Sequence, residues 1–111
     1  MTRATVVLMG MLLASPAGAV TTGQELLETC SKTAAEPGFE RGFCDGYVRA
    51  ISDEMYNYPF VGLQTCFPAD ITSRQLTQIS VKYLREHPGL LHLSAYHNVA
   101  SALLVAFPCK K

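Results

Sequence analysis

Residues 66–89 read CFPADITSRQLTQISVKYLREHPG and carry the clearest secondary-structure signals in the chain. Thr72 and Gln75 have the spacing of a capping box, in which each side chain bonds the backbone amide of the other residue. The apolar positions that follow recur every three or four residues, as one face of a helix requires. They are Leu76, Ile79, Tyr83 and Leu84. Because proline disfavours a helical residue before it, the HPG at residues 87–89 predicts the end of this helix.

Three further helices are predicted around this segment. The first begins at Thr22, a residue type that caps helices, and the second runs from about Phe39 to about Tyr56. The last opens near Ser94 and ends before the FPC at residues 107–109. Their expected core positions are Leu26, Leu27 and Cys30, then Phe43, Tyr47, Ala50, Ile51 and Met55, then Val99, Ala102, Leu103 and Ala106. Alternation at period two is scarce, so we predict an all-α fold, a small up-down bundle of four helices.

Two glycines lie inside the second predicted helix, at Gly42 and Gly46. Each weakens the helix by up to about 1 kcal/mol relative to alanine. They are four residues apart and share one face of the helix. We therefore expect another helix to approach closely at that face.

The amino terminus has the pattern of a secretory signal peptide. A cationic start precedes an apolar run at residues 4–14, and the AGA at residues 17–19 supplies the small side chains that signal peptidase requires. The run is shorter than the roughly 20 residues of a transmembrane helix. We expect cleavage after Ala19, so that residues 1–19 are the signal peptide and residues 20–111 form one exported domain in the periplasm. A retained membrane anchor is the alternative.

The charge of the chain is balanced, with nine Lys or Arg against nine Asp or Glu. Loss of Arg3 with the signal peptide leaves a net charge of about −1 when histidine is neutral. Such a balance gives no electrostatic reason to bind nucleic acid or an anionic membrane.

The four cysteines all lie in the predicted mature chain, and an even count in an exported chain indicates two disulfides. Zinc ligands usually come in close pairs such as C-x-x-C, which do not occur here. In an up-down bundle the end of the first helix lies beside the start of the second, which brings Cys30 close to Cys44. The same geometry brings Cys109 close to Cys66. Pairing Cys30 with Cys109 and Cys44 with Cys66 is the second choice, because bundle handedness permits it.

Candidate catalytic and metal-binding groups are few. The histidines are His87, His92 and His97, and a spacing of five residues on a helix turns successive side chains to different faces. The carboxylates considered as acid–base groups are Asp45, Asp53 and Glu54. No nucleophile is placed near them, and the sequence has no G-x-S-x-G, no C-x-x-C and no glycine-rich phosphate loop. We therefore expect no catalytic residue, no metal and no cofactor, and a protein that is not an enzyme.

One segment suggests binding to a partner. Residues 56–62 read YNYPFVG, an aromatic and apolar run that is expected to form a loop. Aromatic side chains are favoured anchors at protein interfaces. Tyr56, Tyr58 and Phe60 are therefore candidate partner-binding residues. The alternative is that Tyr58, Phe60 and Leu63 only cover the end of a small core.

Short matches to a known family run through the predicted mature chain in order. They are Gly23, Leu26-Leu27, Cys30, Cys44-Asp45-Gly46-Tyr47-Val48, Ile51, Asp53, Cys66-Phe67-Pro68, Ile71-Thr72, Gln75-Leu76, Tyr83-Leu84, His87-Pro88, Ala102-Leu103 and Ala106-Phe107-Pro108-Cys109. With this set the chain resembles the Rap/Tai immunity family, periplasmic proteins that neutralise type VI-secreted amidase effectors. Ala50 departs from the pattern, since glycine is common there in the family.

This resemblance implies a small, helical, disulfide-bonded and often dimeric inhibitor. Its partner would be an amidase that cleaves peptide crosslinks in peptidoglycan, and inhibition would work by occluding the active-site cleft. The alternative from another class is a small periplasmic chaperone of the acid-stress type, which should expose apolar surface at low pH. A structural envelope protein is a third possibility.

Overall fold

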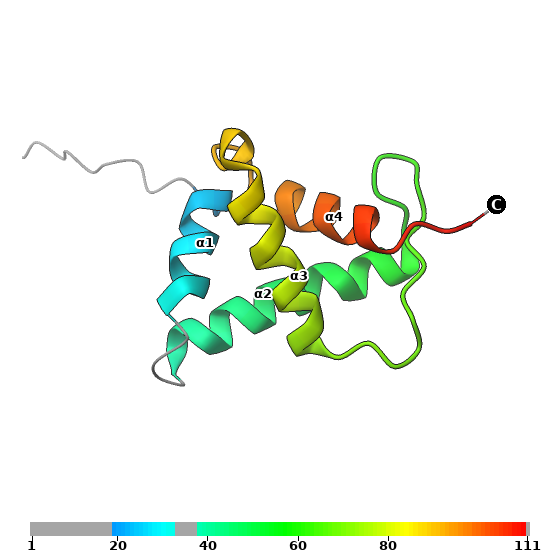
Figure 1. Cartoon of the computed structure of the whole chain (residues 1–111), viewed down its shortest axis with the longest axis horizontal. Helices are drawn as coiled ribbons and strands as arrows, with labels where there is room; N and C mark the ends of the chain where they lie inside the picture. The colour runs from blue at the N-terminus through cyan, green and yellow to red at the C-terminus, as the bar shows by residue number, and fades with distance from the viewer. Residues whose placement is uncertain (1–18, 33–37, 111) are drawn as a thin grey trace, which may run out of the picture.

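The computed structural model describes residues 19–32 and 38–110, and in it four α-helices and one 3₁₀ turn enclose a single core (Figure 1). The elements are α1 (Gly23–Ser31), α2 (Phe39–Asn57), α3 (Ser73–Glu86), the 3₁₀ turn η2 (Pro88–Leu90) and α4 (Ala95–Ala106). The predicted all-α fold of four helices is confirmed. The signal peptide predicted at residues 1–19 lies outside the described residues except for Ala19. None of the helices found in those two ranges is long and apolar enough to cross a membrane.

The helix starts follow from capping residues. The hydroxyls of Thr22 and Ser94 each accept a hydrogen bond, 3.1 Å long, from the backbone amide three residues later. At α3 the Thr72 hydroxyl accepts from the Gln75 amide, and the Gln75 side chain accepts from the Thr72 amide. The predicted capping box is therefore confirmed. The helix ends at Glu86, directly before the predicted stop.

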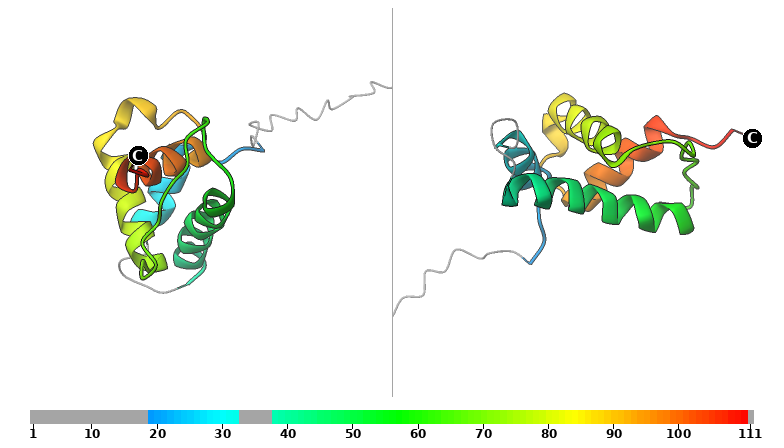
Figure 2. Two further views of the ribbon diagram at one scale, coloured as in Figure 1. Left: turned by 90° about the vertical axis from the view of Figure 1, so that its right-hand side faces the viewer. Right: turned by 90° about the horizontal axis from the view of Figure 1, so that it is seen from below.

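The core lies between α2, which runs along one side of the molecule, and the other three helices (Figure 2). Its buried members are Leu26, Cys30, Cys44, Val48, Ile51, Met55, Leu76, Leu84, Ala95, Val99, Ala100 and Leu103. Two expected core positions are wrong, because Ala50 and Ala106 are exposed. In α2 the buried stripe runs instead through Cys44 and Val48, about one residue further round the helix than expected, with Phe43 and Tyr47 at its edge.

The expected close helix contact at Gly42 and Gly46 is also wrong. A β-carbon added at either residue would meet no atom within 4 Å. The close contact lies at Gly23 instead, where a β-carbon would be 2.7 Å from Nδ2 of Asn98 and 3.2 Å from Cα of Leu91. The first turn of α1 therefore rests directly on the chain that leads into α4.

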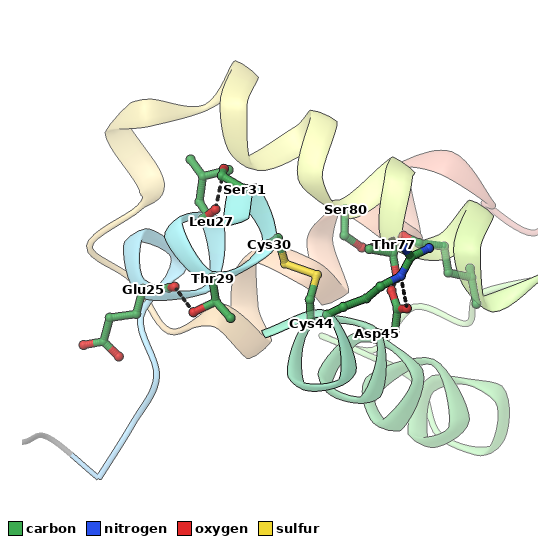
Figure 3. Close-up of a disulfide and its surroundings, with 11 residues drawn as sticks. Glu25, Leu27, Thr29, Cys30, Ser31, Cys44, Asp45, Thr77 and Ser80 are labelled. Carbon is green, nitrogen blue, oxygen red and sulfur yellow. Dashed lines mark hydrogen bonds and ion pairs between the residues drawn. A yellow bond between two sulfur atoms is a disulfide. The ribbon is translucent and has the colours of Figure 1, made fainter. Parts of the chain in front are cut away.

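Both disulfides join the cysteines that we preferred, Cys30 with Cys44 and Cys66 with Cys109. Their Cα atoms are 5.2 and 5.0 Å apart, which fits disulfide geometry. Cys30–Cys44 ties α1 to the first half of α2 inside the core (Figure 3). Cys66–Cys109 ties the segment before α3 to the segment after α4, near the surface.

Candidate functional site

The aromatic segment predicted from the sequence projects from the end of α2, and we call residues 56–63 the aromatic turn. Tyr56 lies on the last turn of the helix and is 71% exposed. Tyr58 is the C-cap, its amide bonded to the Glu54 carbonyl at 2.9 Å, and its side chain is 65% exposed. Phe60 is half-buried, since it packs against the core. Two of the three candidate residues therefore face solvent, and the third supports them.

The tip of the aromatic turn is a tight reversal. The amide of Phe60 donates to the carbonyl of Leu63, and the amide of Leu63 donates back to the carbonyl of Phe60, each at 2.9 Å. Val61 and Gly62 between them both have positive φ angles, of 46° and 79°. Two central residues with positive φ define a type I′ turn, which matches the natural twist of a hairpin.

The base of the aromatic turn is fixed to the body of the protein. The ring of Phe60 meets the rings of Tyr96 and His97 edge-on, with centroids 5.8 Å apart in both cases. The side chain of Gln64 donates to the Met55 carbonyl at 3.2 Å. Two residues further along, the amide of Cys66 donates to the Phe107 carbonyl at 2.9 Å, next to the second disulfide. The tip is therefore carried on a rigid support.

Two tyrosines of the body of the protein, Tyr96 and Tyr47, have raised pKa values. Burial raises the pKa of Tyr96, and the neighbouring Glu54 carboxylate, which shares a hydrogen bond with it, raises that pKa further. Burial also raises the pKa of Tyr47, partly offset by a hydrogen bond to the backbone of Tyr96. Tyr96, whose ring contacts Phe60, therefore keeps its hydroxyl protonated at neutral pH.

Exposed apolar side chains gather at the aromatic turn. Of the seven large ones exposed in residues 19–32 and 38–110, four belong to it. They are Tyr56, Tyr58, Val61 and Leu63. Beside Tyr56 lies an open groove of about 440 Å³ between the second half of α2 and the chain that enters α3. Its lining is Arg49, Ser52, Asp53, Tyr56, Phe67, Pro68, Ala69, Ile71, Ser73 and Leu76.

A model of the Rap1a immunity protein family matches residues 22–109. The chain belongs to this family. The match confirms the resemblance drawn from the sequence, and membership implies immunity to a secreted effector. No curated protein and no solved structure matches the chain. A protein partner is thus implied for this Rap1a family chain, and the aromatic turn holds four of the seven large apolar side chains that are exposed in residues 19–32 and 38–110.

Four of the groups considered as catalytic or metal-binding residues make structural contacts in this Rap1a family member, namely Asp45, Glu54, His87 and His97. Asp45 accepts a hydrogen bond from the Thr77 hydroxyl at 2.9 Å and lies 3.8 Å from Nε of Arg41 (Figure 3). His87 stacks on Tyr83, and its Nδ1 is 2.8 Å from the carbonyl of that residue. Across the residues that the structure describes, no three His, Cys, Asp or Glu side chains are grouped as a metal would require.

Val61 and Leu63 were not among the candidate partner-binding residues, and Leu63 was named only in the alternative, as a residue that covers the core. Both are exposed at the tip of the turn. Their signal was present in the sequence, because glycine at position 62 after a Pro-Phe-Val run marks a tight turn. What the sequence did not show is that the reversal places these two side chains outside the core.

Proposed function

We propose that this chain is a periplasmic immunity protein that binds a type VI-secreted peptidoglycan amidase and inhibits it by occluding its active site. Membership of the Rap1a immunity family supports the immunity role. The observation that carries the mode of action is the aromatic turn, a rigid projection with four exposed apolar side chains. Interface hot spots are enriched in aromatic anchors of this kind, which fill pockets on the partner. The protein acts by steric inhibition, without chemistry of its own.

The distribution of apolar surface favours an inhibitor over the chaperone alternative. A holdase requires a broad apolar face that accepts many unfolded chains. Among residues 19–32 and 38–110, four of the seven exposed large apolar side chains lie within the eight residues of the aromatic turn, and the other three are Val20, Phe39 and Val105. A small, fixed apolar projection suits one shaped pocket better than many unrelated chains.

The periplasm is the compartment that fits this role. Disulfides persist in oxidising compartments, and both pairs of cysteines are bonded in this chain. The signal-peptide pattern at residues 1–19 adds the route of export, with a mature chain from Val20. A homodimer, which the family resemblance also implies, stays a prediction.

The proposal predicts that a gene beside that of this chain encodes a secreted amidase, and it is tested with that amidase in purified form; the absence of such a gene would count against it. Tyr56→Ala and Tyr58→Ala should each weaken binding by about 2 kcal/mol or more if the rings are hot-spot anchors. Both rings are exposed, so the melting temperature should stay close to that of the wild type. Binding is measured by calorimetry, and inhibition by release of peptides from peptidoglycan.

Phe39 provides the matched control, since it is an aromatic residue with 78% exposure at the far end of α2. Phe39→Ala should leave binding unchanged. Phe60→Ala should lower both binding and stability, because its ring also packs on Tyr96. If the wild-type chain does not bind the amidase at micromolar concentration, the proposal is wrong.

A further inference from the structure

We propose that Val61 is the central anchor of the effector-binding surface, held in a strained turn so that its side chain enters an apolar pocket of the effector. This inference rests on the proposed function. It names a residue and a device that family membership does not supply. Three features of the structure support it, namely the backbone conformation of Val61, the exposure of its side chain and the hydrogen bonds and disulfide that hold the turn.

Val61 has a φ angle of 46°, in the left-handed region. That region brings Cβ of an L-residue too close to the next carbonyl oxygen, and β-branched side chains are rare there. Type I′ turns therefore favour Asn or Gly at this position. Valine is among the least suitable residues for it, so the turn carries backbone strain that asparagine would relieve.

Packing of the Val61 side chain does not offset this backbone strain. Its side chain is 70% exposed, and it is absent from the residues that pack on the core. The neighbouring Phe60 supplies the contact with the body of the protein. Strained residues of this kind are kept where function requires them. Valine at this position places an apolar side chain at the tip of the turn, despite the strain.

The support fixes the tip before a partner arrives. Two reciprocal backbone hydrogen bonds close the turn, and the Cys66–Cys109 disulfide holds the chain three residues beyond Leu63. A rigid binding element loses little conformational entropy on association. Tyr58 and Leu63 flank the tip and are exposed, so they would contact the effector beside the pocket that Val61 enters.

A protein pocket suits this tip better than a lipid surface. Membrane-binding segments combine apolar side chains with Lys or Arg that meet anionic headgroups. Residues 53–65 contain Asp53 and Glu54 and no Lys or Arg. The occupant we infer is thus an apolar concavity on the effector, wide enough for a branched aliphatic side chain.

The test is Val61→Asn in the disulfide-bonded mature chain, with melting temperature and affinity measured on the same sample. Relief of the left-handed strain should raise the melting temperature by about 4 °C, the shift that about 1 kcal/mol gives in a domain of this size. Loss of the apolar anchor should weaken binding of the cognate amidase by about tenfold or more. A gain in stability together with a loss of affinity is not expected for a residue that only packs.

Two variants serve as controls. Val105→Asn removes a valine that is 71% exposed on α4, and it should leave affinity unchanged. Val61→Ile keeps a branched aliphatic side chain, and it should bind close to wild type without the gain in stability. Both are measured beside Val61→Asn under the same conditions.

Each contrary outcome has one meaning. If Val61→Asn is more stable but binds as tightly as the wild type, the anchor role is wrong while the immunity role stands. If Val61→Asn is less stable, the strain argument is wrong. A wild-type chain that does not bind the amidase refutes the proposed function and the anchor with it. Sedimentation of the wild type, but not of Val61→Asn, with vesicles of phosphatidylethanolamine and phosphatidylglycerol would assign the tip to a membrane and overturn the inference.

Discussion

The two ends of the molecule differ in whether their apolar side chains are buried or exposed (Figure 1). At the α1 end, Leu26 is fully buried, the Cys30–Cys44 disulfide lies in the core, and Gly23 contacts Asn98 so closely that no side chain fits between them. At the opposite end, the aromatic turn exposes four large apolar side chains on a closed, well-supported loop.

This difference separates stability from binding along the length of one small domain. A chain of this size has little apolar surface to spare, because small domains bury a smaller fraction of their surface. Leaving four such side chains exposed at one end is therefore costly unless a partner covers them. We expect changes at the α1 end to alter stability alone, and changes at the turn end to alter binding.

The largest effect is expected from the double variant Cys30→Ala/Cys44→Ala. Loss of a crosslink over a sequence separation of 14 costs about 3 kcal/mol in loop-closure entropy. Removal of two buried sulfur atoms adds about 1 to 2 kcal/mol of lost packing. The free energy of unfolding, measured in urea, should fall by the sum of the two, about 4 to 5 kcal/mol. The folded fraction should bind the amidase as tightly as the wild type does. A loss of affinity in the folded fraction would contradict the separation of the two ends.

The double variant Cys66→Ala/Cys109→Ala is expected to cost slightly less stability. Its sequence separation of 43 gives about 4 kcal/mol, and the bond lies near the surface, so little packing is lost with it. Here affinity should fall as well, by about 1 kcal/mol, because the support of the aromatic turn becomes mobile.

The paired measurement decides whether this disulfide serves the turn. Urea unfolding gives the stability, and calorimetry at a temperature where both proteins are folded gives the affinity. Equal affinities for the wild type and the double variant would mean that the turn is rigid without the second disulfide. The role that we assign to the bond would then be purely one of stability.

Features that depend on neighbouring residues were predictable from the sequence. The capping box of Thr72 and Gln75 needs only the right side chains three residues apart, and it forms as predicted. The disulfide pairing followed from short connections between antiparallel helices. Tyr56 and Tyr58 are exposed, as expected of aromatic residues in a segment predicted to face solvent.

Features that depend on distant residues were not predictable in the same way. The α2 stripe was placed about one residue off, because Phe43 and Tyr47 border the core while Cys44 and Val48 fill it. Asn98 is fully buried and polar, with its Nδ2 bonded to the Leu90 and Ser94 carbonyls, which no periodicity indicates. The positive φ of Val61 likewise arises from the closed turn and not from the preference of valine.

The smallest expected effect compares two glycines, and it tests whether the α1 end is as tightly packed as the structure indicates. In Gly23→Ala the new methyl group would lie 2.7 Å from Nδ2 of Asn98 and 3.2 Å from Cα of Leu91. The Asn98 amide cannot move away cheaply, because it donates to the Leu90 carbonyl at 2.9 Å. Overpacking of this kind costs about 1 to 3 kcal/mol. Gly46→Ala meets no atom within 4 Å and should instead stabilise α2 by up to about 1 kcal/mol.

The two glycine variants are expected to change the free energy of unfolding in opposite directions, so the comparison does not depend on the exact size of either change. Both replace glycine by alanine in a helix, so the helix propensity of alanine alone would favour both. Only the contact between α1 and the Leu91–Asn98 chain makes the first variant unfavourable. Thermal unfolding of both variants beside the wild type measures the difference, and affinity for the amidase should be unchanged in each. If Gly23→Ala proves as stable as Gly46→Ala, α1 is not seated on Asn98 as described. The α1 end would then be packed less tightly than we infer, and the contrast between a closely packed α1 end and an exposed aromatic turn would no longer hold.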